Sequence, residues 1–135
     1  MEARLTVARR TYIFAGPPGS ASILTSVIEA ALNRPFIREP GTDPYIRAES
    51  VAIYVGAHDF DDGDIDGPDE TPVALHTDYP LLVDVRDTGR NVSRQQDAAA
   101  RIFAAIRADA RLNAVLVDDM QHVLDITDLE TRPRT

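Results

Sequence analysis

The chain has 135 residues, of which 44% are hydrophobic and 27% charged, and these values predict one globular domain rather than a disordered chain. It contains no cysteine, which excludes disulfides, thiolate nucleophiles and cysteine-based zinc sites. All 14 basic residues are arginine, so a lysine Schiff base is also excluded. No apolar run approaches the roughly 18 residues of a membrane span, and the first ten residues lack the apolar segment of a signal peptide. We therefore expect a cytoplasmic protein with no membrane partner.

Strand and helix signals alternate in the first half of the chain. Residues 11–15 are aromatic and β-branched and predict a strand. Ser20 or Ser22 is typical of the cap of a helix that ends near Asn33. The apolar face expected for this helix consists of Ile23, Leu24, Val27, Ile28, Ala31 and Leu32. After it, two prolines and a glycine within 40–44 predict a loop, and the next strand is expected over 50–58.

The second half predicts three further strands and one helix. Residues 79–87 form a strand with alternating side chains, so that one face should lie in the core and the other should be wetter. The wetter face consists of Leu82, Asp84 and Arg86. Ser93 begins the capping-box pattern S-R-Q-Q and predicts a helix that continues to about residue 110. Short strands are expected over 114–117 and 122–126, followed by a frayed polar tail over 128–135.

The expected order is strand, helix, strand, strand, helix, strand, with one more strand in a terminal hairpin. This is the order of a ferredoxin-like (split βαβ) α+β fold, in which two helices pack on one face of a mainly antiparallel sheet of four to five strands. We expect a single domain over residues 1–127. A three-layer α/β sheet with parallel crossovers is the alternative.

The segment 16–20, GPPGS, follows the first strand and resembles the start of the phosphate loop of AAA-type ATPases. That loop has the pattern G-x-x-x-x-G-K-[ST]. Here Ala21 stands in place of the second glycine, Ser22 in place of the phosphate-binding lysine and Ile23 in place of the magnesium-binding hydroxyl. Residues 115–119 resemble the acidic magnesium strand of such ATPases, but a short apolar strand that ends in aspartate is common. We therefore predict a tight strand-to-helix turn at 16–20 rather than a nucleotide site.

Most of the net charge of −8 comes from one segment, residues 58–70, with the sequence HDFDDGDIDGPDE. It holds seven carboxylates and no arginine, and taking these seven charges from −8 leaves −1 for the rest of the chain. Because its charges would be buried without partners, we expect this acidic loop to stay in solvent and not to pack. Such a patch repels nucleic acid and attracts cations or basic proteins.

We expect the acidic loop to bind a basic protein partner and to steer its association. The predicted contact residues are Asp59, Phe60, Asp61, Asp62, Asp64, Asp66, Asp69 and Glu70. Tyr45, Tyr54 and Phe60 are candidate aromatic anchors beside the loop, with core packing as the alternative for all three. Small acidic α+β proteins of this kind are often immunity proteins or antitoxins against basic nucleases, which is an analogy of size and charge only. Such a protein would be non-enzymatic and would run as a monomer or a homodimer.

Calcium binding is a second hypothesis for the same loop. Asp62, Asp64 and Asp66 with Gly67 match D-x-D-x-D-G, the first half of a calcium-binding loop. The second half does not match, because Val73 stands where a bidentate glutamate belongs. No other cofactor is expected.

Signals for catalysis are weak. His58 and His76 could face each other on neighbouring strands, but the three histidines have no metal-binding spacing. Four carboxylates lie at or near strand ends, where a close pair could do acid–base chemistry: Asp84, Asp118, Asp119 and Asp125. The sequence does not pair them. A ring-forming structural protein, such as a phage tail component, is the remaining alternative and is supported only by the coarse order of elements.

Overall fold

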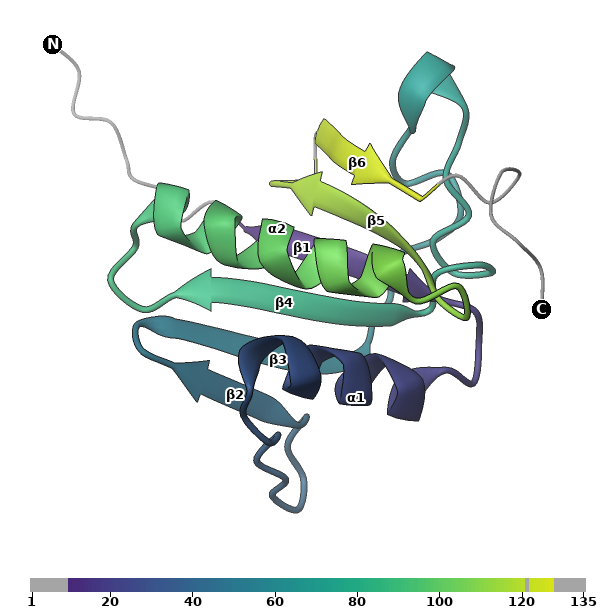
Figure 1. The fold of residues 1–135 in the computed structure, drawn as a ribbon. Coiled ribbons are helices and arrows are strands. Elements are labelled where there is room, and N and C mark those ends of the chain that lie inside the picture. The colour runs from purple at the N-terminus through teal and green to yellow at the C-terminus, as the bar shows by residue number, and fades with distance from the viewer. Residues whose placement is uncertain (1–9, 121, 128–135) are drawn as a thin grey trace, which may run out of the picture.

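The computed structural model describes residues 10–120 and 122–127, and Figure 1 shows two helices lying across one face of a sheet. Within these residues the strands are β1 Thr11–Gly16, β2 Tyr45–Ala48, β3 Val51–Ala57, β4 Leu81–Asp87, β5 Asn113–Asp118 and β6 His122–Ile126. The helices are α1 Ala21–Leu32 and α2 Val92–Ala108, and a 3₁₀ turn spans Pro68–Glu70. The strands lie in the order β2-β3-β4-β1-β5-β6, and all neighbouring pairs are antiparallel.

The α+β class and the two helices packed on an antiparallel sheet are confirmed, but the described sheet has six strands rather than four to five. The alternative with parallel neighbours is wrong for the described strands. The strand absent from the sequence prediction is β2. A two-residue turn, in which Glu49 has a φ of 57°, pairs Ala48 with Val51 and adds β2 to the sheet edge. The expected tail, residues 128–135, lies outside the described residues.

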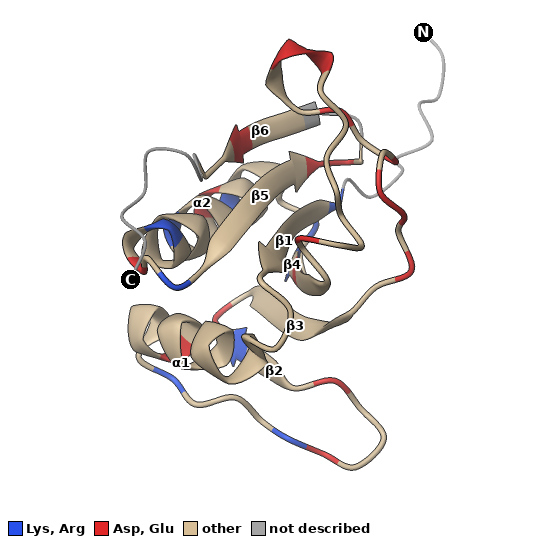
Figure 2. Cartoon of the chain, turned by 90° about the vertical axis from the view of Figure 1, so that its right-hand side faces the viewer, with Lys and Arg blue, Asp and Glu red and all other residues tan. Residues whose placement is uncertain are grey.

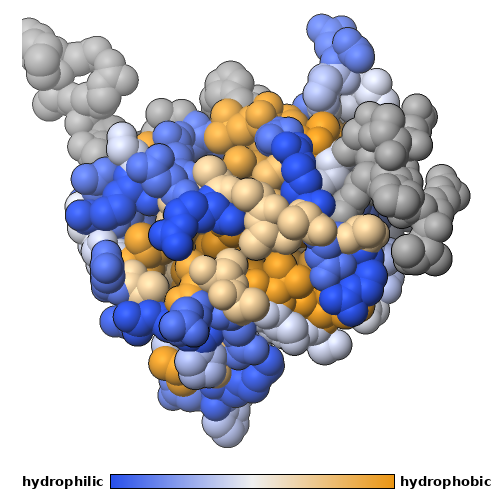
Figure 3. All heavy atoms as spheres, in the orientation of Figure 1, coloured by the Kyte–Doolittle hydropathy of each residue, from blue (hydrophilic) through white to orange (hydrophobic). Residues whose placement is uncertain are grey.

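The larger core lies between the sheet and the helices. Alternate residues of the central strands, such as Ile13 and Val83, are fully buried in one cluster with Leu24 and Ile28 of α1 and Ile102 of α2. On the outer side of this layer, a shallow groove between the two helices is lined mainly by alanine. Figure 3 shows the apolar strip at this face, with hydrophilic side chains around it. Neither of the described helices combines the length and apolarity needed to cross a membrane.

A second core lies on the other face of the sheet, beneath the loop between β3 and β4. Ile65, Val73 and Leu75 of this loop are at most 7% exposed and cluster with Phe14 of β1 and Val115 of β5. The expectation that the acidic loop does not pack is therefore wrong. Its apolar side chains point to the sheet while its carboxylates point to solvent, so no charge has to be buried.

Helix α2 begins earlier than its capping-box pattern predicts. The cap is Asn91 rather than Ser93, because the asparagine side chain accepts a hydrogen bond from the backbone three residues on, at 3.0 Å. Gln95 points inward, where its oxygen accepts from the amide of Asp87 at 3.0 Å and its nitrogen donates to the hydroxyl of Thr11 at 2.8 Å. These bonds tie the start of α2 to the end of β4 and the start of β1.

Asp87 holds this corner together through its carboxylate, which is fully buried. Its hydrogen-bond donors are the Arg94 guanidinium (2.7 and 3.0 Å), the amides of Gly89 (2.9 Å) and Asn91 (2.8 Å), and the Ser50 hydroxyl (3.2 Å). These donors, with the Arg94 guanidinium first, hold the pKa of Asp87 well below its usual range. The folded state therefore strongly favours the charged form of this carboxyl.

We predict that Asp87→Asn lowers the melting temperature at pH 7 by about 5 °C or more. Since the folded pKa is depressed, the stability from this carboxylate is complete above the unfolded pKa of about 3.9 and is lost as the pH falls below it. The difference in melting temperature between wild type and variant should therefore shrink between about pH 4 and pH 2. Asp97→Asn, on the exposed side of α2, is the control and should change little. A difference for Asp87→Asn that does not vary with pH would contradict the assignment.

Candidate functional site

Two aspartates of the acidic loop, residues 58–70, accept hydrogen bonds from the backbone of the connection between β3 and β4. Asp62 accepts hydrogen bonds from the amides of His76 (2.8 Å) and Thr77 (2.9 Å) and from the Thr77 hydroxyl (2.5 Å). Asp64 accepts a hydrogen bond from the amide of Asp61 at 2.8 Å. The Thr77 hydroxyl, followed by its amide, lowers the pKa of Asp62. The loop is thus closed on itself by a charged aspartate.

The predicted contact carboxylates all belong to exposed residues. Figure 2 shows them spread along the loop, from the end of β3 to the 3₁₀ turn. Backbone hydrogen bonds from Gly63 to Val73 (2.9 Å) and from Gly67 to Thr71 (2.8 Å) fix the course of the segment between them. The predicted contact carboxylates therefore lie exposed along one loop whose backbone is fixed by hydrogen bonds.

The candidate aromatic anchors divide between two places. Phe60 is half-buried, with its ring centroid 5.5 Å from that of Phe14, so it closes the second core as well as facing solvent. Tyr45 and Tyr54 lie on β2 and β3, with ring centroids 5.8 Å apart, on the half of the sheet that the loop does not cover. The Tyr45 hydroxyl donates a hydrogen bond to Glu39. Core packing, the alternative for these residues, applies most to Phe60.

The described residues contain no group of three His, Asp or Glu side chains placed to hold a metal ion. Asp62 and Asp64 already accept hydrogen bonds from the loop backbone. A calcium ion bound by Asp62, Asp64 and Asp66 would have to compete with those amides. Calcium binding stays a prediction, which melting in millimolar calcium tests with magnesium as control.

The remaining catalytic candidates are dispersed. Both ring nitrogens of His58 contact the loop backbone, at 3.0 and 2.8 Å. Asp84 lies on the loop side of the sheet. Val117 of β5 belongs to the loop-side core, and because successive strand residues alternate between faces, Asp118 lies on the helix side. Asp125 forms an ion pair at 2.5 Å with Arg107 of α2, on the helix side. The sheet therefore separates Asp84 from Asp118 and Asp125.

The segment GPPGS forms the predicted strand-to-helix turn. A Cβ at Gly16 would lie 1.8 Å from the backbone oxygen of Asp78, so glycine is needed for the close passage of the loop. The Ser20 hydroxyl donates to the carbonyl of Pro17 at 2.6 Å, and α1 begins without a side-chain cap. Local packing accounts for this motif.

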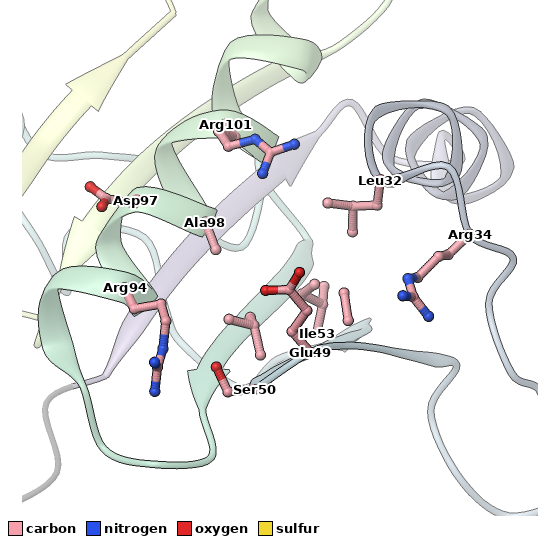
Figure 4. A pocket seen from close by; sticks show the side chains of 11 residues that line it. Leu32, Arg34, Glu49, Ser50, Ile53, Arg94, Asp97, Ala98 and Arg101 are labelled. Carbon is pink, nitrogen blue, oxygen red and sulfur yellow. The ribbon is translucent and has the colours of Figure 1, made fainter.

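A pocket of about 350 Å³ opens on the helix side, between α1, α2 and the β2–β3 turn. Figure 4 shows Arg34, Arg94 and Arg101 around it, with the carboxylate of Glu49 pointing into the space between the helices. Arg94 is bound to Asp87. The carboxylates of Glu49 and Asp97 in the pocket lining offset two of the three arginines. The pocket therefore has little of the excess positive charge that an anion site needs.

A second pocket of about 290 Å³ lies on the uncovered half of the sheet, beside the start of the acidic loop. Its lining includes Asp43, Tyr54, Gly56, Leu82, Asp84 and Arg86. Asp84 is 8% exposed, and its Oδ2 accepts two hydrogen bonds from Arg86, at 3.0 and 2.7 Å. These bonds raise the pKa of Arg86, whose guanidinium lies 5.5 Å from the centroid of the Tyr54 ring. We refer to this site as the carboxylate pocket.

Sequence reasoning did not find the carboxylate pocket. Its residues come from a loop and two strands, and they meet only through the register that pairs Tyr54 with Asp84 and Gly56 with Leu82. The one available signal in the sequence was Asp84, an aspartate on the face of β4 that was predicted to be more polar.

Comparison of the chain with protein-family models, with curated proteins and with solved structures found no match. A functional conclusion therefore depends on geometry and charge alone.

We predict that Asp62→Ala loosens the acidic loop, because it removes the acceptor for two amides and one hydroxyl. Amide hydrogen exchange at His76 and Thr77 should become at least about tenfold faster. Asp61→Ala removes the same charge from the same loop but leaves these bonds in place, and should leave both exchange rates unchanged. Equal rates in wild type and Asp62→Ala would show that the aspartate does not hold the loop.

Proposed function

We propose that this protein is a non-enzymatic binding domain that docks a basic protein partner on its acidic loop. The observation that carries the proposal is that the loop is ordered, with its apolar side chains held against the sheet and its seven carboxylates exposed. No nucleic-acid or membrane partner is proposed, and we expect the protein to act in the cytoplasm.

Order in the loop favours binding for a physical reason. A flexible acidic tether would lose conformational freedom when a partner bound, and this loss would weaken the complex. Here the segment 62–77 is already closed by the bonds of Asp62 and by the backbone pairing of Val73 with Ile65 at 3.0 Å. A basic partner would therefore meet a surface whose charges are already arranged, while their summed field raises the association rate.

We infer that the central strands β3, β4, β1 and β5, with α1 and α2, correspond to the ferredoxin-like order, extended by the edge strands β2 and β6. In support, β1 and β3 run in the same direction on either side of β4, with α1 between them in sequence. The partner class that best fits the size and charge of this chain is a basic nuclease toxin, which would make the protein an immunity protein or antitoxin.

We predict that Asp61→Asn combined with Asp66→Asn slows the association of a fluorescent nona-arginine peptide about threefold or more at low salt, measured by stopped flow. Neither of these side chains takes part in the bonds that close the loop, so the loop should keep its conformation. The salt dependence of the rate should also become weaker.

The matched control is Glu49→Gln combined with Asp97→Asn, which changes net charge equally on the helix side. This control should slow association much less. If both double variants slow association equally, the peptide senses only the net charge of the molecule, and the loop is not the docking surface.

A further inference from the structure

The strongest unexplained group in the described structure is the buried carboxylate of Asp84. Its Oδ2 is bound by Arg86, but none of the described residues donates a hydrogen bond to its Oδ1, which is also shielded from solvent. A buried, unpaired carboxylate oxygen destabilises a folded protein. Asp84 lies near the middle of the sheet, between Tyr54 of β3 and Tyr12 of β1, and it lines the carboxylate pocket. The wall of the pocket thus includes a carboxylate that, among the described residues, has hydrogen-bond donors on one oxygen only.

A second carboxylate lies at the same pocket. A Cβ built on Gly56 would be 2.4 Å from Oδ2 of Asp43, so the Asp43 carboxylate sits directly over the bare backbone of this glycine. Glycine here leaves room for the carboxylate on the sheet face. The pocket therefore has two acidic side chains and one basic side chain, Arg86, and its net charge favours one further cation.

The geometry favours an organic cation over a metal ion. No group of three carboxylate or imidazole side chains in the described chain could hold a metal. One wall of the pocket is the ring of Tyr54, and the guanidinium of Arg86 already lies over this ring. A volume of about 290 Å³ is at the lower end of ligand pockets, which suits one side chain rather than a whole small molecule.

The pocket is also continuous with the acidic loop. Ala57 lines its edge, and the next residue, His58, begins the loop. We propose that the carboxylate pocket receives one arginine or lysine side chain of the basic partner, whose cationic group bonds to Asp84 and Asp43. This inference rests on the proposed function and names the anchor of the complex, because buried charged or aromatic anchors dominate the affinity of such interfaces.

The test is a titration of the ¹⁵N-labelled full chain with N-acetylarginine amide, followed by NMR. N-acetyllysine amide is the second cationic probe, and N-acetylcitrulline amide is the neutral control of similar shape. We expect saturable shifts of the amides of Gly56, Ala57, Leu82 and Asp84 with at least one cationic probe and none with the citrulline probe. Absence of saturable shifts at these amides with both cationic probes would overturn the anchor.

Two variants probe the two carboxylates separately. Asp84→Asn removes the charge, and Gly56→Ala places a methyl group where the Asp43 carboxylate lies, which the flexible aspartate side chain can accommodate by moving. Each should weaken probe binding at least about fivefold. Asp97→Asn, on the helix side, should bind the probes as wild type does. Unchanged affinity in both pocket variants would overturn the proposal.

Thermal melting separates a binding role of Asp84 from a structural one. Because none of the described residues donates to Oδ1, and because Arg86, which is bonded to Oδ2, is 55% exposed, the melting temperature of Asp84→Asn should lie no more than about 2 °C below that of wild type. A merely structural aspartate would lower the melting temperature and leave probe binding intact once folded. That result would count against the anchor, and Gly56→Ala would still measure binding in a folded chain.

Nona-arginine distinguishes failure of the anchor from failure of the proposed function. If the peptide shifts the loop amides 59–70 but not those of the carboxylate pocket, docking stands and the anchor is wrong. If the peptide shifts neither, the docking function fails. If it shifts both, and Asp84→Asn removes only the pocket shifts, the anchor is supported.

Discussion

Burial of strand β1 on both faces is the constraint on which the rest of the structure depends. All six residues of Thr11–Gly16 are buried. A strand with Ile13 on one face and Phe14 on the other cannot leave either side in water without exposing large apolar area. The helices supply cover on one side, and on the other side the buried covering residues of the described core come from the loop between β3 and β4, with Met120 of the β5–β6 turn also packed against it. This requirement explains how a segment with so many carboxylates comes to be ordered.

The same constraint divides the loop side of the sheet into two halves. Over β1 and β5 the side chains beneath the loop are apolar, as with Phe14 and Val115. Over β3 and β4 the corresponding positions include Tyr54, Gly56 and Asp84, which need less apolar cover. The loop packs on the apolar half of the sheet and not on this polar half. The carboxylate pocket, on the polar half, therefore lies next to the start of the acidic loop.

The sequence predicts much of the fold and little of the site. The apolar spacing in α1 and the alternation in β4 locate those elements well, because both depend on local periodicity. Strand β2 escaped prediction because only four residues pair after a proline-rich loop, and pairing is not a local property. Packing of the acidic loop escaped because Ile65 looks like a turn residue between aspartates, although Val73 and Leu75 at alternate positions were a usable signal. The carboxylate pocket depends on strand register, which no local pattern gives.

Asp84 and Asp87 show why counting carboxylates does not locate function. They lie three residues apart on β4 and point to opposite faces of the sheet. Asp87 is bonded on both oxygens by Arg94 and by nearby backbone amides, and this environment depresses its pKa. Asp84 has a donor for one oxygen and, among the described residues, none for the other. A fully bonded carboxylate stabilises the fold in which it sits, whereas a half-bonded one at the wall of a pocket is stabilised when a cation enters. The difference in hydrogen bonding, rather than in charge, therefore separates Asp87, which stabilises the fold, from Asp84, which we propose as the anchor for a partner.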